Sequence, residues 1–185
     1  MKKLLISVMG RDQPGILAAV STVIYQRQGN IENLSQTLLQ SVFGALLIIT
    51  VPDTEAPDDL HKALLEACSK LQLTVHVNPA FPESSAPGAL IQPYIVSVMG
   101  PDRQGLVSTI SSRLAQHDVN ITNMQAVFKG GDKALDNLMI FEVDVPKHTV
   151  MQKLREDLKA ISDSLSLDIS VQHRKIFESV SKIRN

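Results

Sequence analysis

The sequence predicts an α+β protein built from two copies of one β-α-β-β-α-β unit. The first observation is an internal repeat, because the segment 7–15 returns ninety residues later as 97–105. Within it, six residues recur in place: Ser7, Val8, Met9, Gly10, Asp12 and Gly15 match Ser97, Val98, Met99, Gly100, Asp102 and Gly105. The second observation is that short apolar runs alternate with stretches of helical periodicity in each half. A repeat of this length predicts two domains of the same fold.

The repeat continues to the end of each half. Asn30-Ile31 recurs as Asn120-Ile121 at the same offset, and Val51-Pro52 recurs as Val145-Pro146 four residues further on. The second half therefore carries a four-residue insertion. We place it at 129–133, where Lys-Gly-Gly-Asp-Lys is typical of an enlarged hairpin turn.

The first strand and helix are predicted over residues 3–9 and 14–28. Residues 3–9 are an apolar run that ends before Gly10, as in a buried strand. Pro14 is expected at the first helical position, where proline is favoured, and Gly29 is expected to end the helix at positive φ. The apolar face of the helix consists of Ile16, Leu17, Val20, Val23 and Ile24.

The rest of the first half predicts two strands, a helix and a strand. Residues 30–40 and 43–51 are expected to pair as a hairpin joined near Ser41. Residues 57–72 carry leucines and alanines at helical spacing, and residues 73–78 alternate apolar and polar side chains, which indicates a strand with one buried side.

The second half repeats this order. We assign residues 1–78 and 93–174 to the two domains, 79–92 to a linker and 175–185 to a tail that is either a short helix or frayed. The β-α-β-β-α-β order is that of the ferredoxin-like unit, an antiparallel sheet with two helices on one face.

Composition narrows the function classes. The chain has 185 residues, 44% of them hydrophobic, and a formal net charge of −1. That charge argues against direct nucleic-acid binding or an anionic membrane surface, and no apolar stretch approaches the roughly 20 residues that span a bilayer. The single cysteine, Cys68, excludes an intrachain disulfide and fits a reducing cytoplasm. We expect no metal, because the histidines show no metal-ligand spacing: His61, His76, His117, His148 and His173.

Two loops with the same glycine and aspartate spacing follow the first strand of each half. They read Gly10-x-Asp12-x-x-Gly15 and Gly100-x-Asp102-x-x-Gly105. A P-loop requires Lys and then Ser or Thr directly after the second glycine, whereas Ile16 and Leu106 stand there. A nucleotide is therefore not the expected ligand, and no cofactor is expected.

The loops suit a free amino acid. A helix start offers unpaired N–H groups to a carboxylate, and Asp12 or Asp102 would accept a hydrogen bond from an ammonium group. Asn30 and Asn120 carry both donors and acceptors for the ligand's polar end. The structural alternatives are that the aspartates cap the helices, that Gly15 only avoids a clash, and that Asn30 only shapes a turn.

The loops and the following Asn-Ile pairs resemble those of the ACT domain, a regulatory module that typically binds amino acids. The resemblance covers nearly the whole chain. It implies ligand sites between two domains, each formed by the loop of one and the second strand of the other. The residues implied are Asp12, Gln13, Gly15, Ile16, Asn30, Ile31, Asp102, Gly105, Leu106, Asn120 and Ile121. Pro101 and Gln104 depart from the first loop, so the two sites are not expected to be equivalent.

Stand-alone tandem ACT proteins of this length are similar to the glycine cleavage system transcriptional repressor family, which is thought to act through a partner transcription activator. The resemblance implies a cytoplasmic, non-enzymatic homodimer that senses a small amino acid, with glycine or serine favoured. Two alternatives remain: an interaction module that pairs through its sheets without sensing, and a regulatory subunit of a metabolic enzyme.

Overall fold

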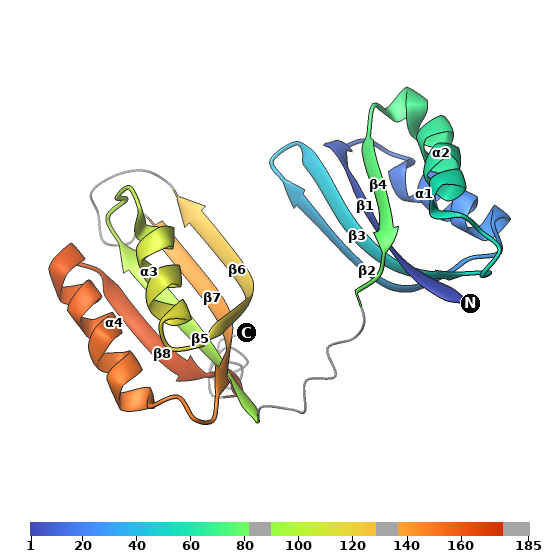
Figure 1. Cartoon of the computed structure of the whole chain (residues 1–185). Helices are drawn as coiled ribbons and strands as arrows, with labels where there is room; N and C mark the ends of the chain where they lie inside the picture. Colours follow the sequence, from blue (N-terminus) through green and yellow to red (C-terminus); the bar gives the residue numbers. More distant parts are fainter. Residues whose placement is uncertain (82–89, 129–136, 176–185) are drawn as a thin grey trace. The chain divides into compact units, whose positions relative to one another are not determined.

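A computed structural model describes residues 1–81, 90–128 and 137–175 (Figure 1). The chain divides into two compact units, Met1–Ser85 and Ala86–Asn185, which are described separately. The expected insertion at 129–133 and the tail from residue 176 lie outside the described residues. Within the described residues, no helix combines the length and apolar character needed to cross a membrane.

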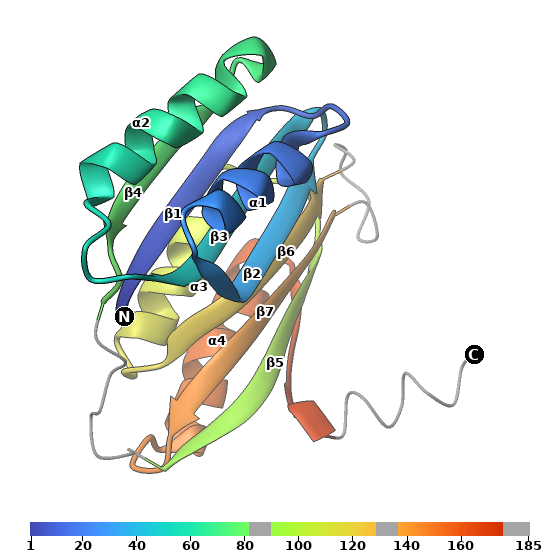
Figure 2. The same cartoon turned by 90° about the vertical axis from the view of Figure 1, so that its right-hand side faces the viewer.

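Unit 1 has the predicted order of elements. They are β1 (Lys2–Arg11), α1 (Ile16–Gln26), β2 (Asn30–Leu39), β3 (Val42–Val51), α2 (Pro57–Cys68) with a 3-10 turn (Ser69–Leu71), and β4 (Thr74–Pro79). The strands form an antiparallel sheet in the order β2-β3-β1-β4. Both helices cover the same face of that sheet (Figure 2). The prediction of a ferredoxin-like unit is confirmed.

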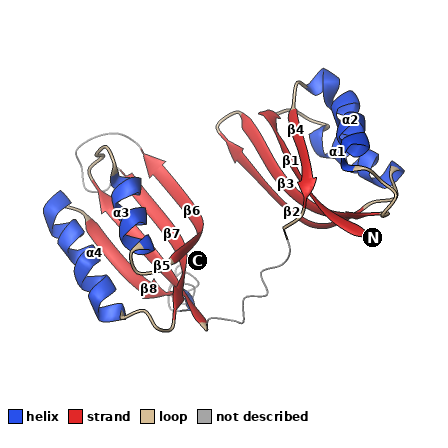
Figure 3. Cartoon of the chain, viewed as in Figure 1, coloured by secondary structure: helices blue, strands red, loops and turns tan. Residues whose placement is uncertain are grey.

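Unit 2 repeats the architecture. Its elements are β5 (Ile91–Gly100), α3 (Leu106–Ala115), β6 (Asn120–Phe128), β7 (Asn137–Pro146), α4 (Met151–Leu165) and β8 (Asp168–His173). The sheet order is β6-β7-β5-β8, with both helices again on one face (Figure 3). The antiparallel α+β fold is therefore present twice.

Each core lies between the sheet and its two helices. In unit 1, three alternate residues in the middle of β1 are buried, and their side chains pack in one core with the apolar faces of α1 and α2. The set includes Leu4, Ile6, Val8, Val20, Ile24, Leu60 and Leu64. In unit 2, Phe141 and Val143 of β7 meet Ile110 of α3 and Leu158 of α4 in the same way.

The first helix begins two residues later than predicted. α1 begins at Ile16, with Gly15 as its N-cap residue at φ 96°, so Pro14 lies in the preceding turn and not at the first helical position. α3 begins in the same way after Gly105, at φ 82°. Both glycines adopt the left-handed conformation that other residues avoid, which reverses the chain direction between strand and helix.

The prediction that Gly29 ends the first helix at positive φ is wrong. The residue with positive φ after α1 is Gln28, at φ 55°, and its counterpart Asp118 does the same after α3, at φ 58°. Gly29 donates its N–H to the Ile24 carbonyl at 2.8 Å. A Cβ atom at Gly29 would lie 3.0 Å from that carbonyl oxygen and 3.1 Å from Val51 Cγ1. Close packing therefore leaves little room for a side chain at Gly29, whereas unit 2 accommodates Val119 at the equivalent position.

Replacing Gly29 with alanine should lower the free energy of unfolding by about 1–3 kcal/mol, because the new methyl group would overlap the Ile24 side chain and carbonyl and the Val51 side chain. Urea unfolding followed by circular dichroism measures it. Gln28→Gly is the matched control and should change stability by only a few tenths of a kcal/mol, since glycine tolerates positive φ. Equal stability of Gly29→Ala and the wild type would show that the packing explanation is wrong.

Candidate functional site

The loops before α1 and α3 present helix N-termini with unoccupied backbone donors. Among the described residues, no side-chain hydrogen bond caps either helix, and neither first turn contains an acidic residue. The first turns close through Ala19 N–H to Gly15 O at 2.9 Å and Thr109 N–H to Gly105 O at 2.8 Å. The preceding N–H groups therefore remain available to an anion. The alternative that Asp12 and Asp102 cap these helices is not seen.

The first loop is fastened to its own unit. The Asp12 N–H donates to the Ser41 carbonyl at 2.9 Å, while the Asp12 side chain is exposed. Gln13 Nε2 donates to the Leu71 carbonyl at 2.8 Å, which joins the loop to the 3-10 turn after α2. Gln13 thus has a structural role, and its contact with a ligand stays a prediction.

The second loop borders an open hollow of about 770 Å³ at the start of α3. Three predicted residues line it: Asp102, Gly105 and Leu106. Arg103, Val107, Ser108 and Ser111 line it as well, and sequence reasoning missed them. Arg103 stands where the first loop has Gln13, so the repeat itself held a signal for it. A guanidinium beside a helix N-terminus suits a carboxylate ligand.

The apolar residues that were predicted to bind the ligand have side chains that pack in or against the cores, so they could offer a ligand mainly their backbone groups. Ile16 is 2% exposed and Leu106 is 4% exposed, and both side chains pack in the cores. Only their N–H groups, at the first helical positions, face the loops. Ile31 and Ile121 also pack against the cores as partly buried residues.

Asn30 lies at the opposite end of the sheet from its own loop. It pairs with Thr50, and Thr50 pairs with Lys3 at the start of β1, whereas the loop follows Arg11 at the end of β1. At about 3.3 Å per residue, β1 holds these ends about 26 Å apart. Asn120 occupies the same place in unit 2 through its pairing with Asp144. Within one unit, the structure does not bring loop and asparagine together.

A β-bulge follows each asparagine. The pairing register shifts between Ile31 and Asn33 in β2, and between Ile121 and Asn123 in β6. The extra residue in unit 1, Glu32, forms an ion pair with Lys3 at 2.9 Å. Bulges are enriched beside functional sites because they redirect side chains, and this one recurs at the same position in both units.

The titratable groups with shifted pKa values lie away from the loops. The hydrogen bond from His117 and the nearby Arg113 lower the pKa of Asp157, which joins the end of α3 to α4. Burial raises the pKa of the Cys68 thiol, which packs in the core of unit 1. Neither arrangement resembles a catalytic site. Across residues 1–81, 90–128 and 137–175, no group of His, Cys, Asp and Glu is placed to hold a metal ion.

Comparison with known proteins agrees with the repeat. The ACT domain family model matches residues 2–78 and 92–172. A UPF0237 protein of Methanopyrus kandleri is 33% identical over 90 residues, which are 48% of this chain and 96% of that protein. A UPF0237 protein of Clostridium perfringens is 34% identical over 90 residues, covering 48% of this chain and 97% of that protein.

Two solved structures share the fold over both units. An unknown protein from Galdieria sulphuraria has a TM-score of 0.76 at 21% identity, covering 93% of this chain and 98% of that one. A protein described as a "putative glycine cleavage system transcriptional repressor" has a TM-score of 0.70 at 17% identity, covering 92% and 96%. Because the family model matches both halves, the chain belongs to the ACT domain family and carries one ACT domain in each unit.

Proposed function

We propose that this protein is a regulatory sensor that binds a small amino acid at the starts of α1 and α3 and modulates a protein partner. One observation carries the proposal. Each unit has an uncapped helix N-terminus that begins at a glycine with positive φ, preceded by an exposed aspartate: Asp12 in unit 1 and Asp102 in unit 2. These groups match the two charges of a free amino acid.

The ligand would be held at both of its charged ends. Its carboxylate would accept hydrogen bonds from the first N–H groups of the helix, where the helix dipole also favours negative charge. Its ammonium would donate to the aspartate. Ser108 and Ser111 beside Arg103 offer further polar contacts in unit 2. We expect glycine or serine as the ligand because of the likeness to a protein described as a glycine cleavage system repressor.

The edge strand β2 offers a route to a complete site. β2 is exposed along most of its length, including three leucines: Leu34 at 40%, Leu38 at 55% and Leu39 at 73%. Exposed edges of this kind favour pairing with another strand. If β2 pairs antiparallel with β2 of a second copy, Asn30 of one copy lies opposite Leu39 of the other.

That pairing would bring the Asp12 loop of one copy and Asn30 of the other to the same end of the paired sheets. Leu39 pairs with Val42, and Val42 pairs with Arg11, so the Leu39 end of β2 adjoins the loop. Asn30 of the second copy would then lie at the same end of the sheet as the Asp12 loop. A ligand bound there stabilises the paired state, which is how its presence can be passed to a partner.

The partner would be a transcription activator or a metabolic enzyme, in the cytoplasmic control of glycine and serine metabolism. The structural likeness to a protein described as a glycine cleavage system repressor supports the first of these. The protein would act without catalysis of its own. The competing function is an interaction module that pairs through its sheets and ignores amino acids.

Calorimetry with glycine and serine tests the proposal. Asp12→Ala and Asp102→Ala should each weaken binding at their own site at least about tenfold, because each removes a charge-assisted hydrogen bond of about 1.5–3 kcal/mol. Asp58→Ala removes an acidic residue from the first turn of α2 and should leave binding unchanged. No heat of binding at millimolar concentration, together with partner capture that is indifferent to amino acids, would favour the interaction module.

A further inference from the structure

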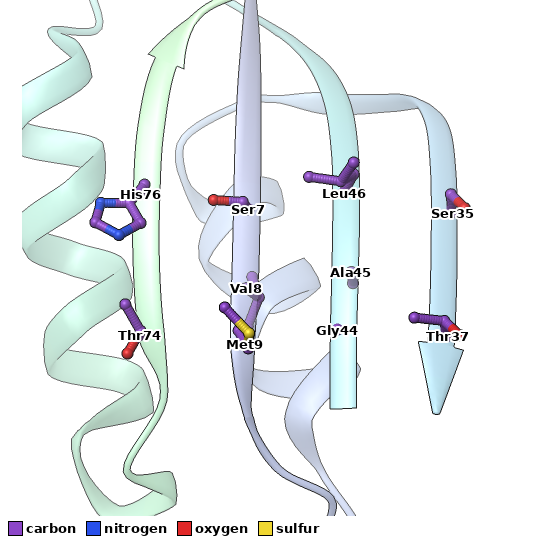
Figure 4. Close-up of a pocket in the computed structure, with 10 residues that line it drawn as sticks. All are labelled: Ser7, Val8, Met9, Ser35, Thr37, Gly44, Ala45, Leu46, Thr74 and His76. Carbon is purple, nitrogen blue, oxygen red and sulfur yellow. The ribbon is translucent and has the colours of Figure 1, made fainter. Parts of the chain in front are cut away.

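The outer face of the sheet in unit 1, which the helices do not cover, is hollowed at Gly44. The hollow has a volume of about 270 Å³. Two rows of cross-strand neighbours line it, and each row has one residue from each of the four strands (Figure 4). The rows are Thr37, Gly44, Met9 and Thr74, and Ser35, Leu46, Ser7 and His76.

Neither backbone conformation nor packing requires glycine at position 44. Gly44 is absent from the positive-φ residues of the described chain. A Cβ atom there would approach Thr37 Cγ2 at 3.6 Å, an ordinary contact, with no other atom within 4 Å. Glycine inside a strand is unfavourable, and it often marks a place where another molecule approaches the backbone closely.

Unit 2 provides an internal comparison, because its equivalent face is filled. Leu138 pairs with Met99 as Gly44 pairs with Met9, so a leucine occupies the place of the hollow. Ser97 Oγ and Ser170 Oγ share a hydrogen bond at 2.7 Å, where unit 1 has Ser7 and His76. The repeat therefore has glycine in unit 1 where unit 2 has leucine, and a serine and a histidine where unit 2 has two serines joined by a hydrogen bond.

The next row of side chains on this face of unit 2 also forms hydrogen bonds within the unit. Glu142 accepts hydrogen bonds from Asn123 at 2.9 Å and from Arg174 at 2.5 Å. The corresponding residue of unit 1 is the apolar Ile48, which pairs with Leu5 and Asn33. Position 48 of unit 1 thus carries no charge where unit 2 has Glu142. The charged pair nearest to it among the described residues is Lys3 with Glu32, at the end of the sheet away from Gly44.

The lining determines which ligand would fit. Met9 and Leu46 form apolar walls and are 57% and 54% exposed. Hydroxyl groups and one imidazole surround them: Ser7, Ser35, Thr37, Thr74 and His76. Of the described residues that line the hollow, none is Asp, Glu, Lys or Arg. A charged ligand would lose water there without gaining an opposite charge, whereas a neutral polar group would find hydrogen-bond partners.

We propose that this hollow is a second binding site, which takes a small uncharged molecule with an apolar body and one or two hydrogen-bonding groups. Its volume is near the lower end for ligand pockets, so the occupant is a small molecule of this class. The site shares no residue with the loops proposed to bind an amino acid.

Two matched probes test it on the full chain: 3-phenylpropanamide and its charged analogue, 3-phenylpropanoate. The amide should shift the backbone amide signals of Ser7, Gly44 and His76 in a ¹⁵N NMR titration, with a dissociation constant on the order of 1 mM, typical for a fragment of this size. The carboxylate should bind at least about fivefold more weakly in a titration at about pH 8, since no Lys or Arg among the described residues lines the hollow. Equal or tighter binding of the carboxylate would overturn the assignment of an uncharged ligand.

Gly44→Leu copies the filled face of unit 2 and should weaken binding of the amide at least about tenfold. The variant should fold, because the added side chain points into open space and strands favour leucine over glycine. An unchanged NMR spectrum outside the hollow and an undiminished melting temperature check this. Thr50→Leu, on the same face of β3 near its other end, should keep binding.

Amide binding that Gly44→Leu does not reduce, or no shift at the hollow, would overturn the proposal. The titration also separates this site from the amino-acid sites. Glycine would be followed at the signals of Gly15 and Gly105, so a failure to bind at one site leaves binding at the other measurable.

Discussion

Replacing Phe141 with alanine should lower the free energy of unfolding of unit 2 by about 3–5 kcal/mol. Phe141 is fully buried and is among the largest buried side chains of the described residues. It lies on β7, where it pairs with Val96 of β5 and Met124 of β6. Its removal leaves a cavity that the strands on both sides hold open, so the surroundings cannot collapse into it.

Native-state amide exchange measures this loss unit by unit. Protection in β5 and β7 should fall in Phe141→Ala, while protection in β1 and β3 serves as the internal reference. Ile140→Ala, on the opposite face of β7, is the matched control and should lower stability by only about 1 kcal/mol, because Ile140 is not in the core. A larger effect at Ile140 than at Phe141 would show that the assigned core face is wrong.

The core could be predicted from the sequence, whereas the reasons for individual glycines could not. The apolar run at 3–9 predicts a buried strand, and the helical spacing in 14–28 predicts an apolar helix face with Val20. Ile6 of β1 and Val20 of α1 are both buried. The prediction of positive φ at Gly29 was wrong, because a glycine can be needed either for positive φ or for close packing against neighbouring atoms. The sequence is the same in both cases. Only the nearness of Ile24 and Val51 shows which reason applies.

The sequence located the two loops, whereas their ligand chemistry stays a prediction and the contacts that hold the loops in place could not be foreseen. The repeated Gly-x-Asp-x-x-Gly spacing located a loop before each first helix, but the start of α1 directly after Gly15 was not predicted. The Gln13 hydrogen bond to Leu71 could not be predicted, because it joins residues far apart in the sequence. The hollow at Gly44 could not be predicted either. Only the pairing register of the strands shows that Met9, Thr37 and Gly44 lie in one row.

The double variant Leu34→Lys with Leu38→Lys should weaken homodimer formation at least about 100-fold, which corresponds to about 2.7 kcal/mol. Both leucines are exposed on β2, the strand proposed to pair between copies. In a twofold dimer each substitution enters the interface twice. Burying unpaired ammonium groups there is strongly unfavourable. Light scattering over a range of concentrations would follow the change between the 20.3 kDa chain and twice that mass.

Leu65→Lys is the control, because Leu65 is 41% exposed, much like Leu34 at 40%, but lies on α2. It should leave the dimer intact. A wild-type chain that stays at 20.3 kDa at every concentration would contradict the proposed pairing.

The double lysine variant should also change amino-acid binding. If the Asp12 loop of one copy and Asn30 of the other share a ligand, the ligand must strengthen the dimer as much as dimerisation strengthens ligand binding, because coupling free energies are reciprocal. The lysine variant should then lose glycine or serine binding at the Asp12 site together with the dimer, although it leaves both loops unchanged, and binding at the Asp102 site serves as the internal reference. A monomeric variant whose Asp12 site binds the amino acid as tightly as the wild type would show that one copy completes that site. The exposed β2 edge would then serve partner binding alone.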